Sequence, residues 1–240
     1  MPTATLTTKT ATFNPPAIIP LKAGQPLQVN NTTTAATLRS LYNRAARAFL
    51  HRDVVQTHSL LMSAFAIIQP PSSYVSDSLA THRRKWDILR ITLETTIYAS
   101  PADNDVIPSS LRDNLMLSSH ILINTLYERS LVLFTPTSQK TSSAFLPSQV
   151  LITLVLSSMK LDCPEVGRLI IEDWLGKRGQ LDESAENGEG YEKVLDMYCL
   201  HVLPRLEEWD YAKEFLQYER ELPQERRTVS YLVFRLQFLN

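Results

Sequence analysis

Glycine is scarce in this chain, with 6 residues in 240, and four of them fall between Gly176 and Gly190. Tight turns between β-strands usually need glycine, because their backbone adopts positive φ angles. The shortage therefore argues against a fold built from strands. Cysteine is scarcer still: Cys163 and Cys199 are too few for a disulfide framework or a zinc cage. We expect a reducing environment such as the cytosol or nucleus.

An excess of charge of one sign is also missing. The formal net charge is -1 and the isoelectric point is about 6.5, so the chain as a whole has no attraction for nucleic acid or for an acidic membrane surface. The two ends nevertheless differ. Residues 1–160 carry 14 basic and 8 acidic side chains, whereas residues 161–240 carry 10 and 17. Any electrostatic binding must therefore be local.

Long apolar runs are absent as well. Runs such as "LVL" at 154–156 are far shorter than the roughly 20 residues that span a bilayer, and the N-terminus has no apolar stretch of a secretory signal. The sequence as given is therefore predicted to be soluble. Residues 1–33 are rich in threonine and proline and contain no acid, and we interpret them as a disordered tail rather than as a transit peptide.

Apolar residues make up 44% of the chain and recur at the three- and four-residue spacings of amphipathic helices. The predicted helices cover 34–51, 53–68, 78–99, 111–134, 148–160, 164–175, 191–206, 209–216 and a ninth from 229 onwards. This pattern predicts an all-α fold: an irregular stack of antiparallel helical hairpins, similar to an α-solenoid, in one domain over 34–240. Polar loops near 135–145 and 176–190 are expected to be flexible.

Two of these helices have features of their own. The helix over 111–134 is the longest and is apolar on most sides, so we expect it to be the central, most buried element. The helix over 191–206 contains Pro204, which has no backbone N–H and whose ring crowds the preceding turn. A bend is predicted there.

No set of residues points to catalysis, a cofactor or a metal. The triplet His51–Arg52–Asp53 resembles part of a kinase catalytic loop, but the required asparagine is replaced by His58, and the glycine-rich loop is missing. His51 and His58 could hold a metal only with ligands from elsewhere. "GKRGQ" at 176–180 lacks the spacing of a phosphate-binding loop. The sequence therefore predicts a protein that is not an enzyme.

The basic string "HRRKW" at 82–86 is the strongest local charge. Asp77 and Asp87 flank it, and no second basic face is evident, so a nucleic-acid site is not predicted. Together with the arginines of the first hairpin it could form one side of a protein interface. The residues of this candidate interface are Arg44, Arg47, Arg52, Arg83, Arg84 and Lys85, with Arg39 nearby. An ordinary solvated basic face is the alternative.

Three segments of the chain resemble the peroxin-26 family, the peroxisomal membrane peroxins related to yeast peroxin-15. The first is "NRAARAFLHRDVVQTHSLLMSAF" at 43–65, similar to the opening helical hairpin of that family. The second is "LPSQVLITLVLSSMKLDCPEVGRLIIEDWL" at 146–175. In the third, Tyr191, "HVLPRL" at 201–206 and "AKEFL" at 212–216 agree in order and spacing. Together the segments cover about a third of the chain.

The resemblance implies a function. Members of the family are tail-anchored proteins whose cytosolic domain recruits a heterohexameric AAA ATPase, made of two peroxins, to the peroxisomal membrane. The ATPase extracts the ubiquitinated import receptor for reuse. The implied partner is the N-terminal domain of one ATPase subunit, with the ubiquitinated receptor as a further candidate, and ATPase recruitment points to the N-terminal hairpin. This sequence departs from the family in having no membrane anchor, which is expected to follow the cytosolic domain.

Two other readings stay open from the residues alone. The chain could be a soluble helical-repeat scaffold of another pathway, such as tail-anchor targeting or proteasome assembly. It could also be an all-α enzyme, which would need a polar pocket with paired carboxylates or histidines.

Overall fold

The protein is all-helical, as predicted. The computed structural model describes residues 31–73, 77–101, 107–178 and 187–221, and these ranges contain helices and turns but no strand. The helices are α1 (Asn31–Leu50), α2 (Val54–Phe65), α3 (Ala80–Ala99), α4 (Ser109–Leu115), α5 (Ser119–Phe134), α6 (Ser148–Lys160), α7 (Pro164–Arg178), α8 (Asn187–Met197), α9 (Leu203–Arg205) and α10 (Trp209–Tyr218). A 3₁₀ turn, η2 (Ser143–Phe145), precedes α6.

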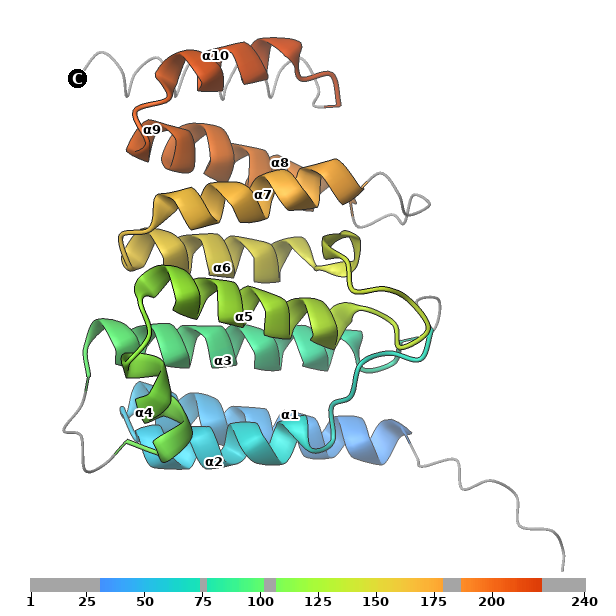
Figure 1. The fold of residues 1–240 in the computed structure, drawn as a ribbon. Helices are drawn as coiled ribbons and strands as arrows, with labels where there is room; N and C mark the ends of the chain where they lie inside the picture. The colour runs from blue at the N-terminus through green and yellow to red at the C-terminus, as the bar shows by residue number, and fades with distance from the viewer. Residues whose placement is uncertain (1–30, 74–76, 102–106, 179–186, 222–240) are drawn as a thin grey trace, which may run out of the picture.

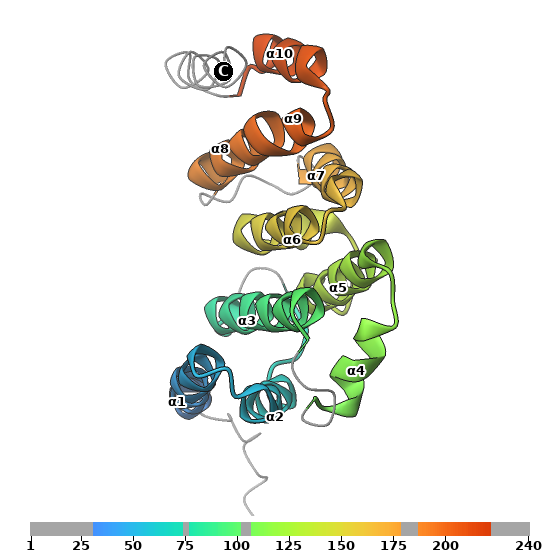
Figure 2. The ribbon, with the colours of Figure 1, turned by 90° about the vertical axis from the view of Figure 1, so that its left-hand side faces the viewer.

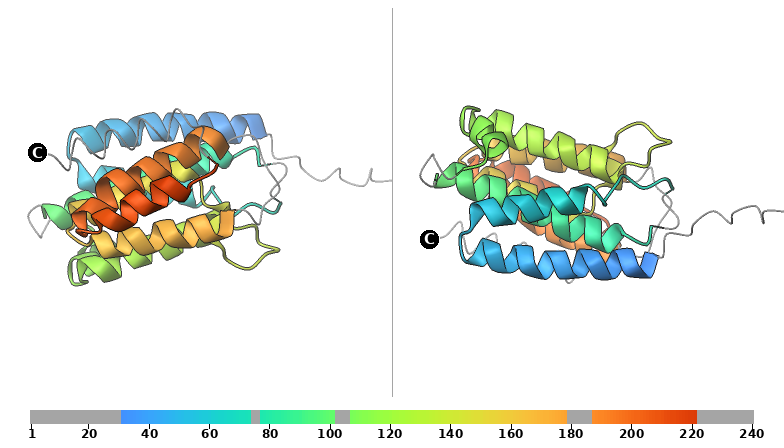
Figure 3. Two further views of the ribbon diagram at one scale, coloured as in Figure 1. Left: turned by 90° about the horizontal axis from the view of Figure 1, so that it is seen from above. Right: turned by 90° about the horizontal axis from the view of Figure 1, so that it is seen from below.

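The helices form a two-layer stack. One layer contains α1, α3, α6 and α8, which all run in the same direction, and the other contains α2, α5, α7 and α10, which run in the opposite direction (Figure 1, Figure 2). The short helix α4 lies across the second layer, between α2 and α5 (Figure 2). Seen from above, α8 and α10 are tilted relative to the helices beneath them (Figure 3). The irregular stack of antiparallel hairpins is therefore confirmed.

Three of the hairpin turns have the same construction and lie on the same side of the stack, on the left in Figure 1. Each has one non-glycine residue in the left-handed conformation, at Arg52 (φ 59°), Asp162 (φ 55°) or Glu207 (φ 62°). In each, the next backbone N–H bonds to a carbonyl five residues earlier, as in a Schellman cap. These bonds are Asp53 N to Ala48 O, Cys163 N to Ser158 O and Glu208 N to Leu203 O, all 2.9 Å. Glycine is usual at this position because it has no Cβ. Each non-glycine residue in the left-handed conformation therefore costs about 1 kcal/mol of folding free energy.

The prediction of one long central helix over 111–134 is wrong. The chain breaks at 116–118, where the Ser118 Oγ accepts a hydrogen bond from the backbone N–H of Ile121 and caps α5. The apolar spacing continues through the break, so spacing alone does not reveal it. The central element is α6, which packs against α3, α5, α7 and α8. In α5, by contrast, Ile121 and Val132 are more than half exposed.

Pro204 is accommodated by a change of helix type. A π turn covers Tyr198–Val202, and the N–H of Leu203 bonds to the carbonyl of Tyr198, one residue farther back than in an α-helix. Where a bend was predicted in the helix over 191–206, the structure has a widened turn that ends two residues before the proline. The chain then continues as α9, in which Pro204 donates no backbone hydrogen bond.

Several predictions fall partly or wholly outside the described residues. The tail is described only from residue 31, where α1 begins, and the ninth helix from 229 lies outside. The loop predicted over 176–190 is corrected at both ends, because residues 176–178 belong to α7 and residues 187–190 to α8, and only 179–186 lie outside the described residues. The loop at 135–145 is described. The Thr135 Oγ1 accepts from the Ser142 N–H at 3.2 Å, and the Ser143 hydroxyl donates to the Asp173 carbonyl at 3.1 Å. These bonds hold one part of the loop against α7, and its flexibility stays a prediction.

Gly167 allows α6 and α7 to approach closely. A Cβ at this position would lie 2.3 Å from the Oγ of the buried Ser158. We expect Gly167→Ala to lower the free energy of unfolding by about 2 kcal/mol, because the added methyl group overpacks this contact. Gly176 in the same helix is the matched control, since a Cβ there meets nothing within 4 Å. Gly176→Ala should raise stability by about 0.5–1 kcal/mol.

Urea denaturation followed by circular dichroism measures both effects. Ser158→Ala in the Gly167→Ala background should recover part of the loss, because it removes the atom that the new methyl group meets. An unfolding midpoint of Gly167→Ala equal to or above that of the wild type would show that the two helices do not meet closely here.

Candidate functional site

Three of the predicted interface residues lie exposed on the first hairpin. Arg44 and Arg47 project from α1, and Arg52 lies in the turn between α1 and α2. Arg44 and Arg47, together with Ala48, His51, Asp53 and Gln56, line a hollow of about 370 Å³. The carboxylate of Asp53 accepts a hydrogen bond from the backbone N–H of Gln56 at 2.9 Å and so caps α2. The lining thus combines two arginines with one carboxylate that is held in a helix cap.

Arg83 is not part of this surface, and its assignment to the interface is corrected. Its side chain is 3% exposed and pairs with Asp77. Its Nη2 and Nε also donate to the carbonyl oxygen of Gln69, at 2.7 and 3.1 Å. The guanidinium thus ties the first turn of α3 to the segment that leaves α2. A charge held in this way cannot reach a partner.

Arg84 and Lys85 are the next two residues of α3, and the structure places them closer to solvent. Arg84 is partly exposed and Lys85 is exposed. Because successive helical residues point about 100° apart, one string of four basic residues divides between the interior and the surface.

An arginine and a histidine join Lys85 at the edge between α1 and α3. The rings of Tyr42 and Trp86 meet edge to face, with centroids 5.3 Å apart, and this contact sets the register of the two helices. One turn earlier in each helix lie Arg39 and His82. The pKa of His82 is lowered by burial and by the charges of Arg39 and Lys85. In the sequence, Tyr42 and Trp86 both occupy apolar positions of their helices, and this was the available signal that α1 and α3 pack together.

The basic residues that share one surface in the structure are therefore fewer than the predicted ones and only partly the same. We use "basic surface" for Arg39, Arg44, Arg47, His82 and Lys85. Arg52 lies apart from Arg39 at the far end of α1, about 20 Å away at the rise of an α-helix. The basic surface covers the exposed side of α1 and the adjoining edge of α3.

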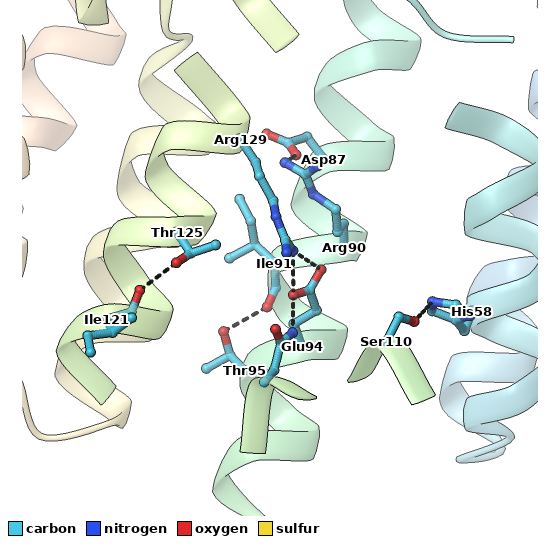
Figure 4. Close-up of polar contacts among 11 residues, drawn as sticks. His58, Asp87, Arg90, Ile91, Glu94, Thr95, Ser110, Ile121, Thr125 and Arg129 are labelled. Carbon is cyan, nitrogen blue, oxygen red and sulfur yellow. Dashed lines mark hydrogen bonds and ion pairs between the residues drawn. The ribbon is translucent and has the colours of Figure 1, made fainter. Parts of the chain in front are cut away.

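A buried polar cluster lies on the opposite side of α3, facing α4 and α5 (Figure 4). Asp87 is fully buried. The hydroxyl of Ser130 donates to its Oδ2 at 2.7 Å, and the Nη2 of Arg90 lies 2.5 Å from its Oδ1. Burial raises the pKa of Asp87 even though Arg90 and Ser130 act to lower it. Loss of solvation thus outweighs the nearby positive charge.

Glu94, two turns further along α3, is the second buried carboxylate. The Nδ2 of Asn114 in α4 donates to its Oε2 at 2.6 Å, and the Nη1 of Arg129 in α5 lies 3.1 Å from the same oxygen (Figure 4). Sequence reasoning missed this pair, because nothing in the spacing of Asp87 and Glu94 shows that both face inward. Each carboxylate is held by an arginine and a neutral donor. The cluster joins three helices, and we interpret it as structural.

The histidines and cysteines do not assemble into a site. Among the described residues, no group of three or more His, Cys, Asp and Glu side chains could hold a metal ion. His58 instead bonds to the Ser110 hydroxyl at 3.0 Å, linking α2 to α4 (Figure 4). Burial raises the pKa of the Cys199 thiol to about 12 and also raises that of Cys163. Both thiols are therefore protonated and weakly nucleophilic at neutral pH.

The chain was compared with known proteins, and no family model, curated protein or solved structure matches it. The resemblance to the peroxin-26 family therefore rests on the three segments themselves and stays a prediction. Each segment contains one of the three hairpin turns with a left-handed residue: Arg52 in 43–65, Asp162 in 146–175 and Glu207 in 191–216.

The part of the chain that the structure describes includes no helix with the length and apolar character needed to cross a membrane.

Proposed function

We propose that this chain is an adaptor that recruits the heterohexameric AAA ATPase peroxin complex to the cytosolic face of the peroxisomal membrane, where the ATPase recycles the import receptor. The observation that carries the proposal is the resemblance of three segments, in the same order as in the peroxin-26 family. Membrane attachment through a tail anchor is part of the proposal.

The first hairpin is the proposed docking site for the N-terminal domain of one ATPase subunit. It lies at the end of the stack, and α1 and α2 contain no acidic residue. The hairpin also carries three exposed apolar side chains: Leu50 (78%), Val55 (48%) and Met62 (59%). Protein interfaces are enriched in arginine and methionine, and complementary charge speeds the encounter. The hairpin therefore suits a partner surface that carries acidic side chains.

In this proposal the protein acts by binding and not by catalysis, and needs no cofactor. The left-handed turns, the buried polar cluster and the close contact between α6 and α7 give the stack a defined shape. The C-terminal hairpin of α8, α9 and α10 serves as scaffold and closes the stack. A rigid platform binds with little loss of conformational entropy, which favours affinity.

Charge reversal on α1 tests the proposal. Arg44→Glu combined with Arg47→Glu is expected to weaken binding of the purified ATPase complex by about 10- to 100-fold and to reduce the salt dependence of binding. Biolayer interferometry at low and high salt measures both quantities. Lys213→Glu on the exposed face of α10 is the matched control and should bind like the wild type.

The circular dichroism spectrum and the unfolding midpoint must be those of the wild type, so that a loss of binding is not a loss of fold. Unchanged affinity and unchanged salt dependence in such a folded variant would rule out this surface. A pull-down from lysate of the source organism that recovers neither AAA peroxin would rule out the adaptor function itself.

A further inference from the structure

Two basic side chains and one imidazole, from two helices, lie at the edge between α1 and α3, where the two charges act on the imidazole. Arg39 belongs to α1, and His82 and Lys85 belong to α3. The Tyr42–Trp86 contact, 5.3 Å between ring centroids, holds the two helices in register one turn away. Arg39 and Lys85 are exposed, while His82 is only partly exposed. The imidazole is therefore less accessible to solvent than the two charges that act on it.

The acidic residues of these helices face elsewhere. Helix α1 has none. In α3, Asp87 and Glu94 are both buried on the side that faces α4 and α5, where Arg90 and Arg129 hold them. Asp77, just before α3, pairs with the buried Arg83. No carboxylate of α1 or α3 therefore compensates the positive charge at this edge, and neither does Asp77.

Uncompensated charge has a measurable consequence at His82. Both neighbouring charges that act on this imidazole are positive, and they add to the effect of burial in lowering its pKa. A dianion bound between the three side chains would reverse the sign of the local potential and favour the imidazolium. Arginine can donate two parallel hydrogen bonds to such an anion, and lysine adds a point charge.

We propose that Arg39, His82 and Lys85 form a binding site for a phosphate monoester dianion, either a free phosphate compound or the headgroup of a phosphorylated lipid. A dianion with several acceptor oxygens can accept from more than one of these side chains, whereas chloride provides one charge and no fixed geometry. This inference does not depend on the proposed adaptor function.

Titration with inorganic phosphate, followed by NMR of the His82 imidazole over about pH 5–8, tests the site. Sodium chloride at equal ionic strength is the reference. Phosphate is expected to raise the pKa of His82 saturably. Arg39→Gln and Lys85→Gln should each weaken phosphate binding by about tenfold, because each removes one charge-assisted contact. Arg47→Gln, on the same helix but outside the group of three, should leave binding unchanged.

Vesicles distinguish the two sources of phosphate. Binding to phosphatidylcholine vesicles that carry a phosphatidylinositol monophosphate, reversed by free phosphate, assigns the site to a lipid headgroup. Phosphate binding without vesicle binding assigns it to a soluble compound. The inference is overturned if phosphate moves the His82 titration no further than chloride does. It is also overturned if Arg47→Gln weakens binding as much as Arg39→Gln, since the effect would then come from the general charge of the surface.

Discussion

Replacement of Arg83 by alanine is expected to lower the free energy of unfolding by about 3 kcal/mol. The substitution leaves Asp77, 17% exposed, without its cationic partner, and removes two donors from the Gln69 carbonyl. Removing one member of a buried ion pair costs about 3–5 kcal/mol, and the partial exposure of Asp77 places this case at the lower end. Chemical denaturation measures the loss.

Lys85→Ala is the matched control, because Lys85 lies two residues away on the same helix and is exposed. We expect it to change stability by less than about 0.5 kcal/mol. The contrast separates two roles within one basic string. If Arg83→Ala unfolds at the denaturant concentration of the wild type, Arg83 does not hold α3 to the segment after α2, and it returns to the set of candidate interface residues.

Replacement of Trp86 by alanine is expected to have the largest effect, about 3–5 kcal/mol. Trp86 is 0% exposed and its ring meets that of Tyr42. The substitution leaves a cavity between α1 and α3, and the first hairpin has few other helices to pack against. Because this hairpin carries the proposed docking surface, the variant should bind the ATPase poorly. Phosphate should also no longer raise the pKa of His82 in this variant.

Native-state hydrogen exchange locates the damage. Amides of α1 and α2 should exchange faster in Trp86→Ala, while those of α6 and α7 should be affected least. Trp86→Phe is the control. The Nε1 of Trp86 is buried without a hydrogen-bond partner, so phenylalanine loses volume but no bond, and it should cost much less than alanine. Equal protection of α1 in the alanine variant and the wild type would contradict the role assigned to Trp86.

Local signals in the sequence predicted most of the helices. Asp53 is the cap of α2, and Pro164 is the first residue of α7, where a missing backbone N–H costs nothing. Glycine scarcity correctly argued against strands. It did not show that three helical hairpins use Arg52, Asp162 and Glu207 in left-handed turns where glycine is usual. A turn of this kind depends on the two helices that it joins, not on the residue alone.

The candidate site was harder to predict than the fold. Arg44, Arg47 and Lys85 are exposed as expected, whereas Arg83 is buried within the same run of charges. Asp87 and Glu94 form an internal network that spacing did not reveal. Charged residues follow no single rule for the side they face, because an ion pair or a hydrogen bond across the stack can compensate for burial.

By itself the sequence determined that this protein is a series of amphipathic helices joined as hairpins, because helix periodicity, caps and proline positions act within a few residues. Only the tertiary structure decided where α4 ends and α5 begins, and which charges lie inside. It also placed Arg39 beside His82, because these outcomes depend on contacts between residues far apart in the chain.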